Sequence, residues 1–275
     1  MPEAARHSHS AGRQPVLFLP HGGGPCFFMD WPDTWDAMAA YLRGVRNTLP
    51  QKPDAILVVS GHWETRVPTV TSGAHPSLIY DYYGFPPHTY QLDYAAPGSP
   101  QLAQTVQHLL ADAGIAAEQD PHRGFDHGVF IPFMLAFEKA DIPVVELSLQ
   151  QDMDPAQHLR IGQALAPLRD QNILIVGTGL TYHNLRHFMR GDPRSNDAAR
   201  QFDTWLTQAI TQPETQRNQA LVQWESAPAA RICHPREDHL LPLMVVAGAA
   251  GADSGIRTYS DTVMGKALSG FTFGG

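Results

Sequence analysis

Three short apolar segments, each with a glycine and a histidine close behind it, stand out in the hydrophobic pattern of the chain. Each is apolar at consecutive positions, which is typical of a parallel strand covered on both faces. The segments span residues 15–19, 55–60 and 173–176, and the histidines that follow them are His21, His62 and His183. Because ligands of open α/β sheets bind at the carboxyl ends of strands, these imidazoles are predicted to lie at a functional edge.

Apolar residues at helical spacing predict helices between these strands. The first helix spans Asp33–Leu49, with Asp33 or Thr34 as its N-cap and Trp35 on its apolar face. Tyr80–Pro100 has no period and is predicted to be a long ordered loop of the kind that often carries function. The other predicted helices cover residues 100–113, 129–139, 155–169, 197–211 and 240–250, and further strands cover residues 67–71, 144–148, 256–259 and 268–273.

The order of these elements predicts the fold class. Strands alternate with helices, which favours a single-domain α/β fold with a mostly parallel central sheet covered by helices on both faces. Antiparallel strands are expected near the C-terminus. No internal repeat or linker divides the chain, so we expect one domain over residues 15–275, preceded by a disordered tail over residues 1–14.

Composition and charge mainly exclude certain classes of partner and location for the protein. Of the 275 residues, 43% are hydrophobic, and 27 acidic against 19 basic side chains give a net charge of −8. This balance argues against nucleic acid or an anionic membrane as the partner. Cys26 and Cys233 are too few for a disulfide framework and indicate a reducing cytoplasm. The polar first fifteen residues and the lack of a long apolar run predict a chain that does not cross a membrane, and a homo-oligomer is compatible with the sequence.

The chain contains 14 histidines. Their positions relative to the predicted strands and helices indicate which of them are candidates for catalysis or metal binding. His21 precedes three glycines, and taken alone it is better explained as part of a tight turn. His62 is the stronger candidate because it ends a strand and is followed by Trp63 and Glu64. If the chain stays extended, the side chain of Glu64 points the same way as that of His62.

Other motifs combine an imidazole with polar neighbours. Asp126 and His127 precede an apolar helix, whose amino terminus favours a neutral imidazole suited to acid/base chemistry, although Asp126 is equally explained as a helix cap. His183 is followed by an amide side chain and preceded by hydroxyls. The segment His234–His239 offers several ligands, and composition alone does not separate a metal site from a solvated acidic turn.

Six short segments, which include most of these motifs, follow one another in a characteristic order along the chain. They are Pro20–Gly22, Val59–Trp63, Gly124–Gly128, Ile142–Ser148, His183–Arg186 and Glu237–Leu243. Together they resemble the ordered motifs of the class III extradiol ring-cleavage dioxygenases, and they are most similar to the branch of the 4,5-DOPA dioxygenases. The resemblance spans about residues 15–250. Several motifs in this order identify the family far more specifically than any single motif does.

The resemblance implies that residues 15–275 form a catalytic domain, which cleaves the ring of a DOPA-like or related catechol with O2. The implied metal-ligand positions are His21, His62, His239 and, as an additional ligand or an acid/base group, His183. His127 becomes the second catalytic histidine. We expect His239 rather than His234 to be the ligand of the last motif, because burial of the Leu240–Pro242 segment would fix its direction.

A nitrogen-rich site with open positions suits non-haem Fe(II), which has to accept two catechol oxygens and still leave room for dioxygen. Zn²⁺ would occupy the same ligands but cannot perform the redox step. Fe(II) is therefore the expected cofactor, and Zn²⁺ is the other candidate occupant. The residues alone leave two alternatives: a zinc-dependent hydrolase with His127 or Glu64 as base, and a protein that binds a metal or an anion without turnover.

Overall fold

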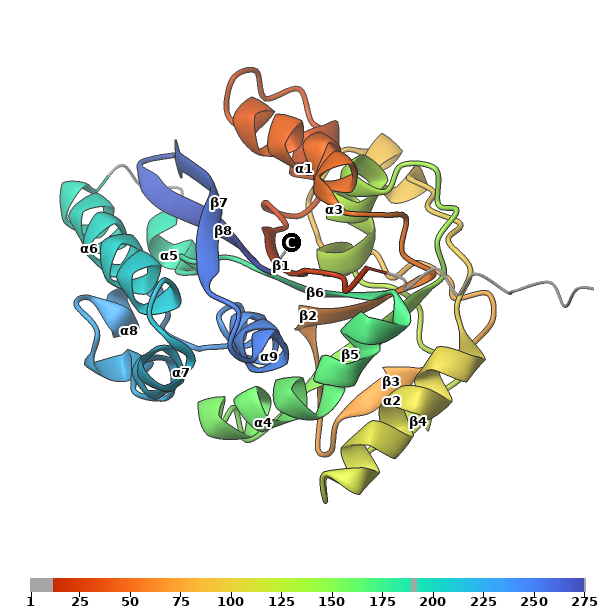
Figure 1. The fold of residues 1–275 in the computed structure, drawn as a ribbon. Helices are drawn as coiled ribbons and strands as arrows, with labels where there is room; N and C mark the ends of the chain where they lie inside the picture. The colour runs from red at the N-terminus through yellow and green to blue at the C-terminus, as the bar shows by residue number, and fades with distance from the viewer. Residues whose placement is uncertain (1–11, 189–191, 275) are drawn as a thin grey trace, which may run out of the picture.

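One eight-stranded sheet runs through the computed structural model, which describes residues 12–188 and 192–274 (Figure 1). The strand order is β4-β3-β5-β2-β6-β1-β8-β7. The strands are β1 (Val16–Pro20), β2 (Ala55–Thr65), β3 (Thr69–Thr71), β4 (Glu118–Asp120), β5 (Val144–Gln150), β6 (Ile173–Gly179), β7 (Gly255–Val263) and β8 (Lys266–Phe273). Strands β5, β2, β6 and β1 are parallel neighbours, whereas β8 pairs antiparallel with β1 and β7. The mostly parallel α/β sheet is confirmed, with its antiparallel addition at the C-terminus.

Helices cover both faces of the sheet (Figure 1). One face carries α1 (Asp36–Thr48) and α3 (His127–Ala136), which pack on each other. The other face carries α2 (Pro100–Asp112), α4 (Pro155–Leu165) and α9 (Leu241–Ala250). Beside the β7–β8 hairpin lie α5 (Leu185–Phe188), α6 (Pro193–Ile210), α7 (Glu214–Val222) and α8 (Ala230–Cys233), and short 3₁₀ helices cover Cys26–Phe28, Pro87–Gln91, Ala166–Gln171 and Trp224–Ser226.

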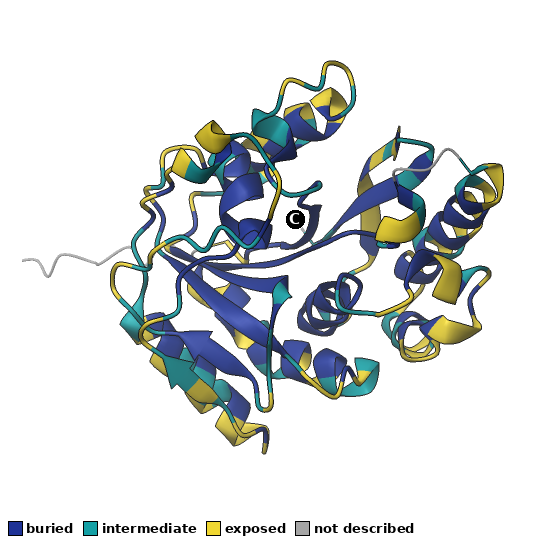
Figure 2. Ribbon diagram, turned by 180° about the vertical axis from the view of Figure 1, so that it is seen from behind, coloured by how far each residue is buried: buried dark blue, intermediate teal, exposed yellow. Residues whose placement is uncertain are grey.

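The buried layer consists of the central strands and the two helices that are apolar on all sides, α3 and α9 (Figure 2). Every residue of α9 is buried, because the helix lies between the sheet and α4. Two buried arginines bind the carbonyl groups at its C-terminal end: Arg169 donates to Ala250 and Arg217 to Gly251. These carbonyls have no partner within a helix, so the arginines fix the end of α9 opposite the end that follows His239.

Some predicted boundaries are wrong by a few residues. The first helix begins at Asp36 and not at Asp33, because Asp33 adopts a left-handed conformation with φ 62° and Trp35 takes the N-cap position. Strand β2 does not end at Ser60 but continues through His62 to Thr65. The helix predicted from residue 129 begins at His127, with Asp126 as its N-cap. Each difference changes the structural position of a residue that lines the candidate site, namely Trp35, His62 and His127.

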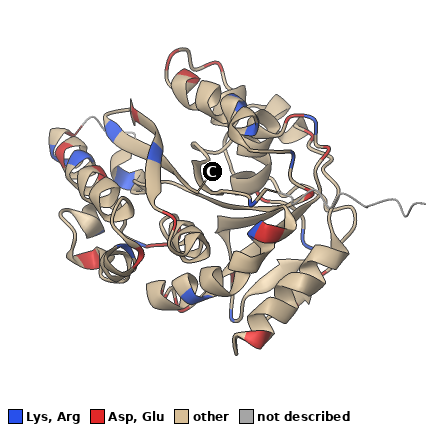
Figure 3. Cartoon of the chain, viewed as in Figure 1, with Lys and Arg blue, Asp and Glu red and all other residues tan. Residues whose placement is uncertain are grey.

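Residues 1–11 of the predicted tail lie outside the described residues. Within the remaining part of that tail, Gln14 is buried, and its Nε2 donates a hydrogen bond of 2.6 Å to Asn172 Oδ1. No helix within residues 12–188 and 192–274 combines the length and the apolar character needed to cross a bilayer. In the view of Figure 3, the positions of basic and acidic residues are interspersed over the outer helices and loops.

Candidate metal centre

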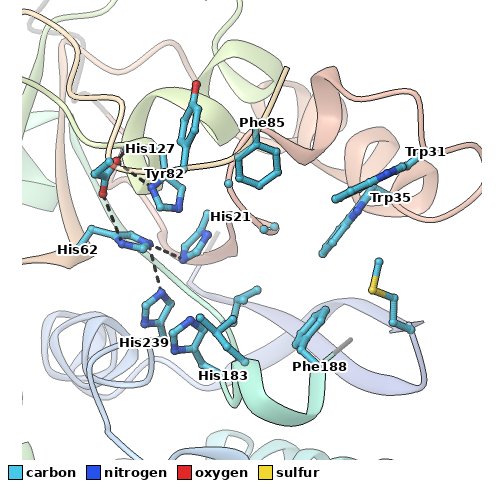
Figure 4. Close-up of a pocket in the computed structure, with 17 residues that line it drawn as sticks. His21, Trp31, Trp35, His62, Tyr82, Phe85, His127, His183, Phe188 and His239 are labelled. Atoms are coloured by element: carbon cyan, nitrogen blue, oxygen red, sulfur yellow. Dashed lines mark hydrogen bonds and ion pairs between the residues drawn. The ribbon is translucent and has the colours of Figure 1, made fainter. Parts of the chain in front are cut away.

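Three imidazoles from distant parts of the chain converge at the carboxyl edge of the sheet (Figure 4). The Nε2 atom of His62 lies 3.4 Å from Nε2 of His21 and 3.2 Å from Nε2 of His239. His21 and His239 are buried, and His62 is nearly so. The structure thus brings together three of the histidines singled out in the sequence, and each offers the same ring nitrogen to a common point.

The backbone around β6 holds two of these histidines in place. The His21 N–H donates to the Gly179 carbonyl at 3.2 Å, directly beyond the β1–β6 pairing. The Leu180 N–H donates to the His239 carbonyl at 3.1 Å. This approach requires glycine at position 179, since a Cβ there would lie 2.2 Å from the His239 carbonyl oxygen.

His62 is fixed from behind by the N-cap of α3. The His62 N–H donates to Ser60 Oγ at 3.2 Å, and Ser60 Oγ donates to Asp126 Oδ1 at 2.7 Å. Asp126 Oδ1 also accepts from the Gly128 N–H, as an N-cap does. A Cβ at Gly128 would lie 2.8 Å from Cδ2 of His62, so the helix approaches the ring as closely as the backbone allows. Asp126 is therefore a helix cap that also positions His62.

A carboxylate backs His239 on the side away from the cluster. Asp238 Oδ1 accepts hydrogen bonds from the backbone N–H and from Nδ1 of His239, at 2.8 and 2.9 Å. Nδ1 of His183, whose ring stacks on His239, lies 3.7 Å from the same oxygen. Burial raises the pKa of Asp238, but its contacts with His183 and His239 outweigh this and hold the pKa well below its usual range. Because a carboxylate only accepts, Nδ1 of His239 carries the proton, which leaves the Nε2 lone pair for a metal ion.

A second carboxylate orients His127. Asp81 Oδ1 accepts from the backbone N–H and from Nδ1 of His127, at 2.9 and 2.8 Å. Its Oδ2 lies 3.6 Å from Nδ1 of His62. Burial raises the pKa of Asp81, yet the hydrogen bond from His127 gives a net lowering. The rings of His127 and His62 have centroids 3.9 Å apart, so His127 lies beside the three converging imidazoles. Its Nδ1 is used by Asp81, and its Nε2 has no hydrogen-bond partner among the described residues.

The protonation states of the cluster fit a cation. Burial, followed by the proximity of the other histidines, lowers the pKa of His21 and of His62 well below the usual value. The same two causes lower the pKa of His239 to about 4, against the opposing effect of Asp238. Near neutral pH all three imidazoles are therefore neutral, as ligation requires. Neutral nitrogen lone pairs that converge at these distances repel one another, and a shared cation removes that repulsion.

The cluster forms one end of a cavity of about 620 Å³. Its walls come from the glycine loop after β1, the start of α1, the loop after β3, the β6–α5 segment and the β7–β8 turn (Figure 4). The long loop predicted over Tyr80–Pro100 contributes Asp81, Tyr82 and Phe85. Phe27 and Phe130 do not line the cavity and pack behind it, against Trp35 and Tyr80.

Two other candidates lie away from the cluster. His234 is buried, with its Nε2 3.0 Å from the Thr181 carbonyl and its ring against Phe202. Glu64 does not follow the direction of His62: the register of β2 against β5 shifts between Val59 and Glu64, and the Glu64 carboxylate pairs with Arg236. Glu64 is therefore not placed to act as a base in the cavity.

Sequence reasoning missed Asp81, because it lies in an aperiodic loop and gains its meaning only from contact with His127. It also missed the cavity walls formed by Trp31 and Phe188. Trp35 was predicted on the apolar face of the first helix; it is buried, but it occupies the N-cap and lines the cavity. Asp238 is one of two acidic residues in its motif, and nothing in the sequence indicates that it, rather than Glu237, accepts the hydrogen bond from Nδ1 of His239.

This fold and this cluster define a class of enzyme. Residues 16–271 match the family model described as the catalytic LigB subunit of aromatic ring-opening dioxygenase, and the chain belongs to that family. Its members are metal-dependent oxidoreductases that cleave aromatic rings, which agrees with a cluster built from neutral imidazoles. The predicted family is confirmed, and the dioxygenase is favoured over the zinc hydrolase.

Individual relatives cover most of the chain. It is 43% identical over 210 residues to "4,5-DOPA dioxygenase extradiol" of Beta vulgaris, covering 74% of this chain and 76% of that protein. It is 38% identical over 282 residues to "Dioxygenase tasH" of Hapsidospora irregularis, covering 96% and 86%. A crystal structure of an uncharacterised protein from Escherichia coli K12 superposes with a TM-score of 0.76 at 31% identity, covering 95% and 100%. The chain is thus similar to extradiol dioxygenases along nearly its whole length.

Proposed function

We propose that this chain is an Fe(II)-dependent extradiol dioxygenase that opens the ring of a catechol with O2. The observation that carries the proposal is the convergence of three Nε2 atoms, from His21, His62 and His239, at the end of a cavity of about 620 Å³. That volume is in the range of small-molecule sites. The names of relatives such as the Beta vulgaris enzyme support a DOPA-like or related catechol as the substrate class.

The three converging imidazoles are the proposed metal ligands. They would hold a ferrous ion, which would supply the redox chemistry that the reaction of a catechol with dioxygen requires. His183 stacks on His239 and lines the same cavity, so it is assigned as an additional ligand or as a second proton-transfer group. Zn²⁺ suits the same nitrogen donors but does not change oxidation state.

His127 is the proposed general acid/base. Asp81 holds the proton of His127 on Nδ1, so its Nε2 accepts a proton from a catechol hydroxyl and later returns it. The Asp81 carboxylate compensates the positive charge that His127 gains in the meantime. The apolar walls limit the access of water, which strengthens this pairing.

A reducing, cytoplasmic setting is part of the proposal. Cys26 and Cys233 are both free and buried, so neither is used in a disulfide. Burial raises the pKa of Cys233 to about 12, which keeps its thiol protonated and unreactive.

Anaerobic loading with Fe(II), followed by air and a panel of catechols, tests the proposal. We expect oxygen uptake together with a yellow ring-opened product, and no oxygen uptake from a matched Zn²⁺-loaded sample. Ester or amide hydrolysis by the Zn²⁺ form, with no oxygen uptake by the Fe(II) form for any catechol, would contradict it.

A further inference from the structure

The cavity has two chemically different ends (Figure 4). All of its titratable histidines and its only carboxylate, among the described residues, gather at the metal end. The opposite end is formed by aromatic rings, and Figure 4 shows Trp31, Trp35 and Phe188 across the cavity from His62. No Lys or Arg side chain in the described parts of the chain lines either end.

The aromatic end is apolar. The rings of Trp35 and Phe188 are nearly parallel, with planes 7° apart and centroids 6.3 Å apart. Phe85, Leu185 and Met264 also line the cavity. The hydroxyl of Tyr82 donates to the Thr89 carbonyl at 2.5 Å, so it is already used outside the cavity.

The proposed function fixes the direction of a bound catechol. Its two oxygens face the imidazoles, so ring carbons 4 and 5 point away from the metal end. A substituent on carbon 4 therefore extends toward Trp31, Trp35 and Phe188. This end of the cavity decides which substituents are accepted.

Among the residues that the structure describes, a charged substituent finds no countercharge there. Moving an ion from water into apolar surroundings is costly unless it is paired and hydrogen-bonded. Asp81, the only carboxylate side chain among the described lining residues, already pairs with His127. The indole Nε1 of Trp35 is buried and has no hydrogen-bond partner among the described residues, so it offers one donor to a neutral oxygen. One such donor does not compensate a carboxylate.

We infer that the preferred substrate is a catechol whose carbon-4 substituent is uncharged and largely apolar, and not an amino acid such as DOPA. The inference rests on the proposed function for the orientation of the ring. It rests on the lining of the cavity for the nature of the substituent.

Four catechols with similar short chains test the inference: 4-propylcatechol, 3-(3,4-dihydroxyphenyl)propionate, dopamine and L-DOPA. With the Fe(II)-loaded enzyme we expect kcat/KM for 4-propylcatechol to exceed that for the anion and for L-DOPA by at least about tenfold, a typical effect of one apolar contact in a hydrophobic pocket. Equal or higher values for L-DOPA or the anion would overturn the inference. A preference for dopamine would overturn it as well, by indicating that the aromatic rings select an ammonium group.

Binding to the metal-free protein separates the inference from the proposed function. Quenching of tryptophan fluorescence reports occupancy next to Trp31 and Trp35, and we expect the same order of affinities without turnover. This order together with no oxygen uptake from any catechol would refute the dioxygenase proposal and leave the substituent preference standing. Turnover of unsubstituted catechol without any preference among the four substituted catechols would refute the substituent preference and leave the dioxygenase proposal standing.

A pair of variants localises the effect. Leu185 lines the cavity yet is 70% exposed, so Leu185→Arg places a cation at its margin without unfolding the core. We expect this variant to shift the ratio of kcat/KM between the anion and 4-propylcatechol toward the anion by about tenfold or more. Ile256→Arg is the matched control, because Ile256 is 59% exposed on β7 and does not line this cavity. An equal shift in both variants would contradict the assignment.

Discussion

The imidazole of His183 lies face to face with that of His239, with ring centroids 3.3 Å apart and planes 13° apart. Both rings direct Nδ1 toward Asp238 Oδ1. A proton on one ring disfavours a proton on the other, and this proximity contributes to the lowered pKa of His239. The stack therefore places His183 directly against one of the three converging imidazoles.

The first prediction concerns this stack. His183→Ala should keep one Fe(II) per chain, because the three converging Nε2 atoms do not include His183. Turnover should fall by about 10²-fold, as for a lost proton-transfer group. Metal analysis after gel filtration checks the stoichiometry. Loss of the ion would identify His183 as a fourth ligand.

His127→Ala should bind Fe(II) and catechol and lose turnover by about 10²–10⁴-fold. The reason is that His127 carries the free Nε2 beside the cluster but is oriented by Asp81 rather than by the other imidazoles. Single-turnover oxygen uptake measures the loss. Full activity would make His127 a packing residue, and missing iron would make it a ligand.

Asp81→Asn should retain the ion and lower kcat by about 10–100-fold, the usual effect of removing the partner that orients a functional histidine. An amide oxygen still accepts from Nδ1 of His127, but it does not compensate positive charge on the ring. We expect KM for catechol to change little. A loss confined to KM would mean that Asp81 contacts the substrate instead.

Two histidines five residues apart give a matched pair. His239→Gln should abolish Fe(II) binding, whereas His234→Gln should retain it, because the His234 ring packs on Phe202 and points to Thr181. Since that site is fully buried, His234→Gln should instead lower the free energy of unfolding by about 1–3 kcal/mol. Titration with Fe(II) and urea unfolding separate the two effects. Normal iron binding by His239→Gln would remove it from the ligand set.

The last prediction concerns pH. Glu146 on β5 is fully buried, and burial together with the nearby Asp126 raises its pKa well above the usual value. The folded state therefore holds this proton more tightly than the unfolded state. Stability falls as pH rises from the unfolded pKa, about 4.3, toward the folded pKa, by about 1.4 kcal/mol for each unit between them.

Glu146→Gln removes this titration, so urea unfolding of the metal-free variant between pH 5 and 8 should show a weaker decline than the parent protein. Glu118→Gln, at an exposed position on β4, is the control and should follow the parent. Identical pH dependence of all three proteins would show that Glu146 is ionised in the fold.

The sheet and the histidines could be predicted from the sequence because both follow a local rule. Consecutive apolar residues indicate buried parallel strands, and a histidine after such a strand lies at the ligand-binding edge. His21, His62 and His183 all satisfy this rule, and the cavity contains them. His239 lacks a preceding strand, and only the resemblance of its motif identified it.

What could not be predicted depends on long-range contacts. Asp81 gains its role from a histidine 46 residues away. Glu64 was expected to face the cavity, and the irregular pairing of β2 with β5 turns it toward Arg236. Side chains alternate between the two faces of a strand only while its pairing with the neighbouring strand is regular, and β-bulges are common next to active sites.

The strand order has a consequence for how the protein is made. β1, the first strand of the chain, pairs with β6 and with β8, the last strand. During synthesis His21 leaves the ribosome early, but its strand has no neighbours until residues 173–179 and 266–273 have followed. Such long-range pairing is slow to form. Under the proposed function, the metal would therefore be bound after translation, because the three histidines converge only once β1 has paired with its neighbours.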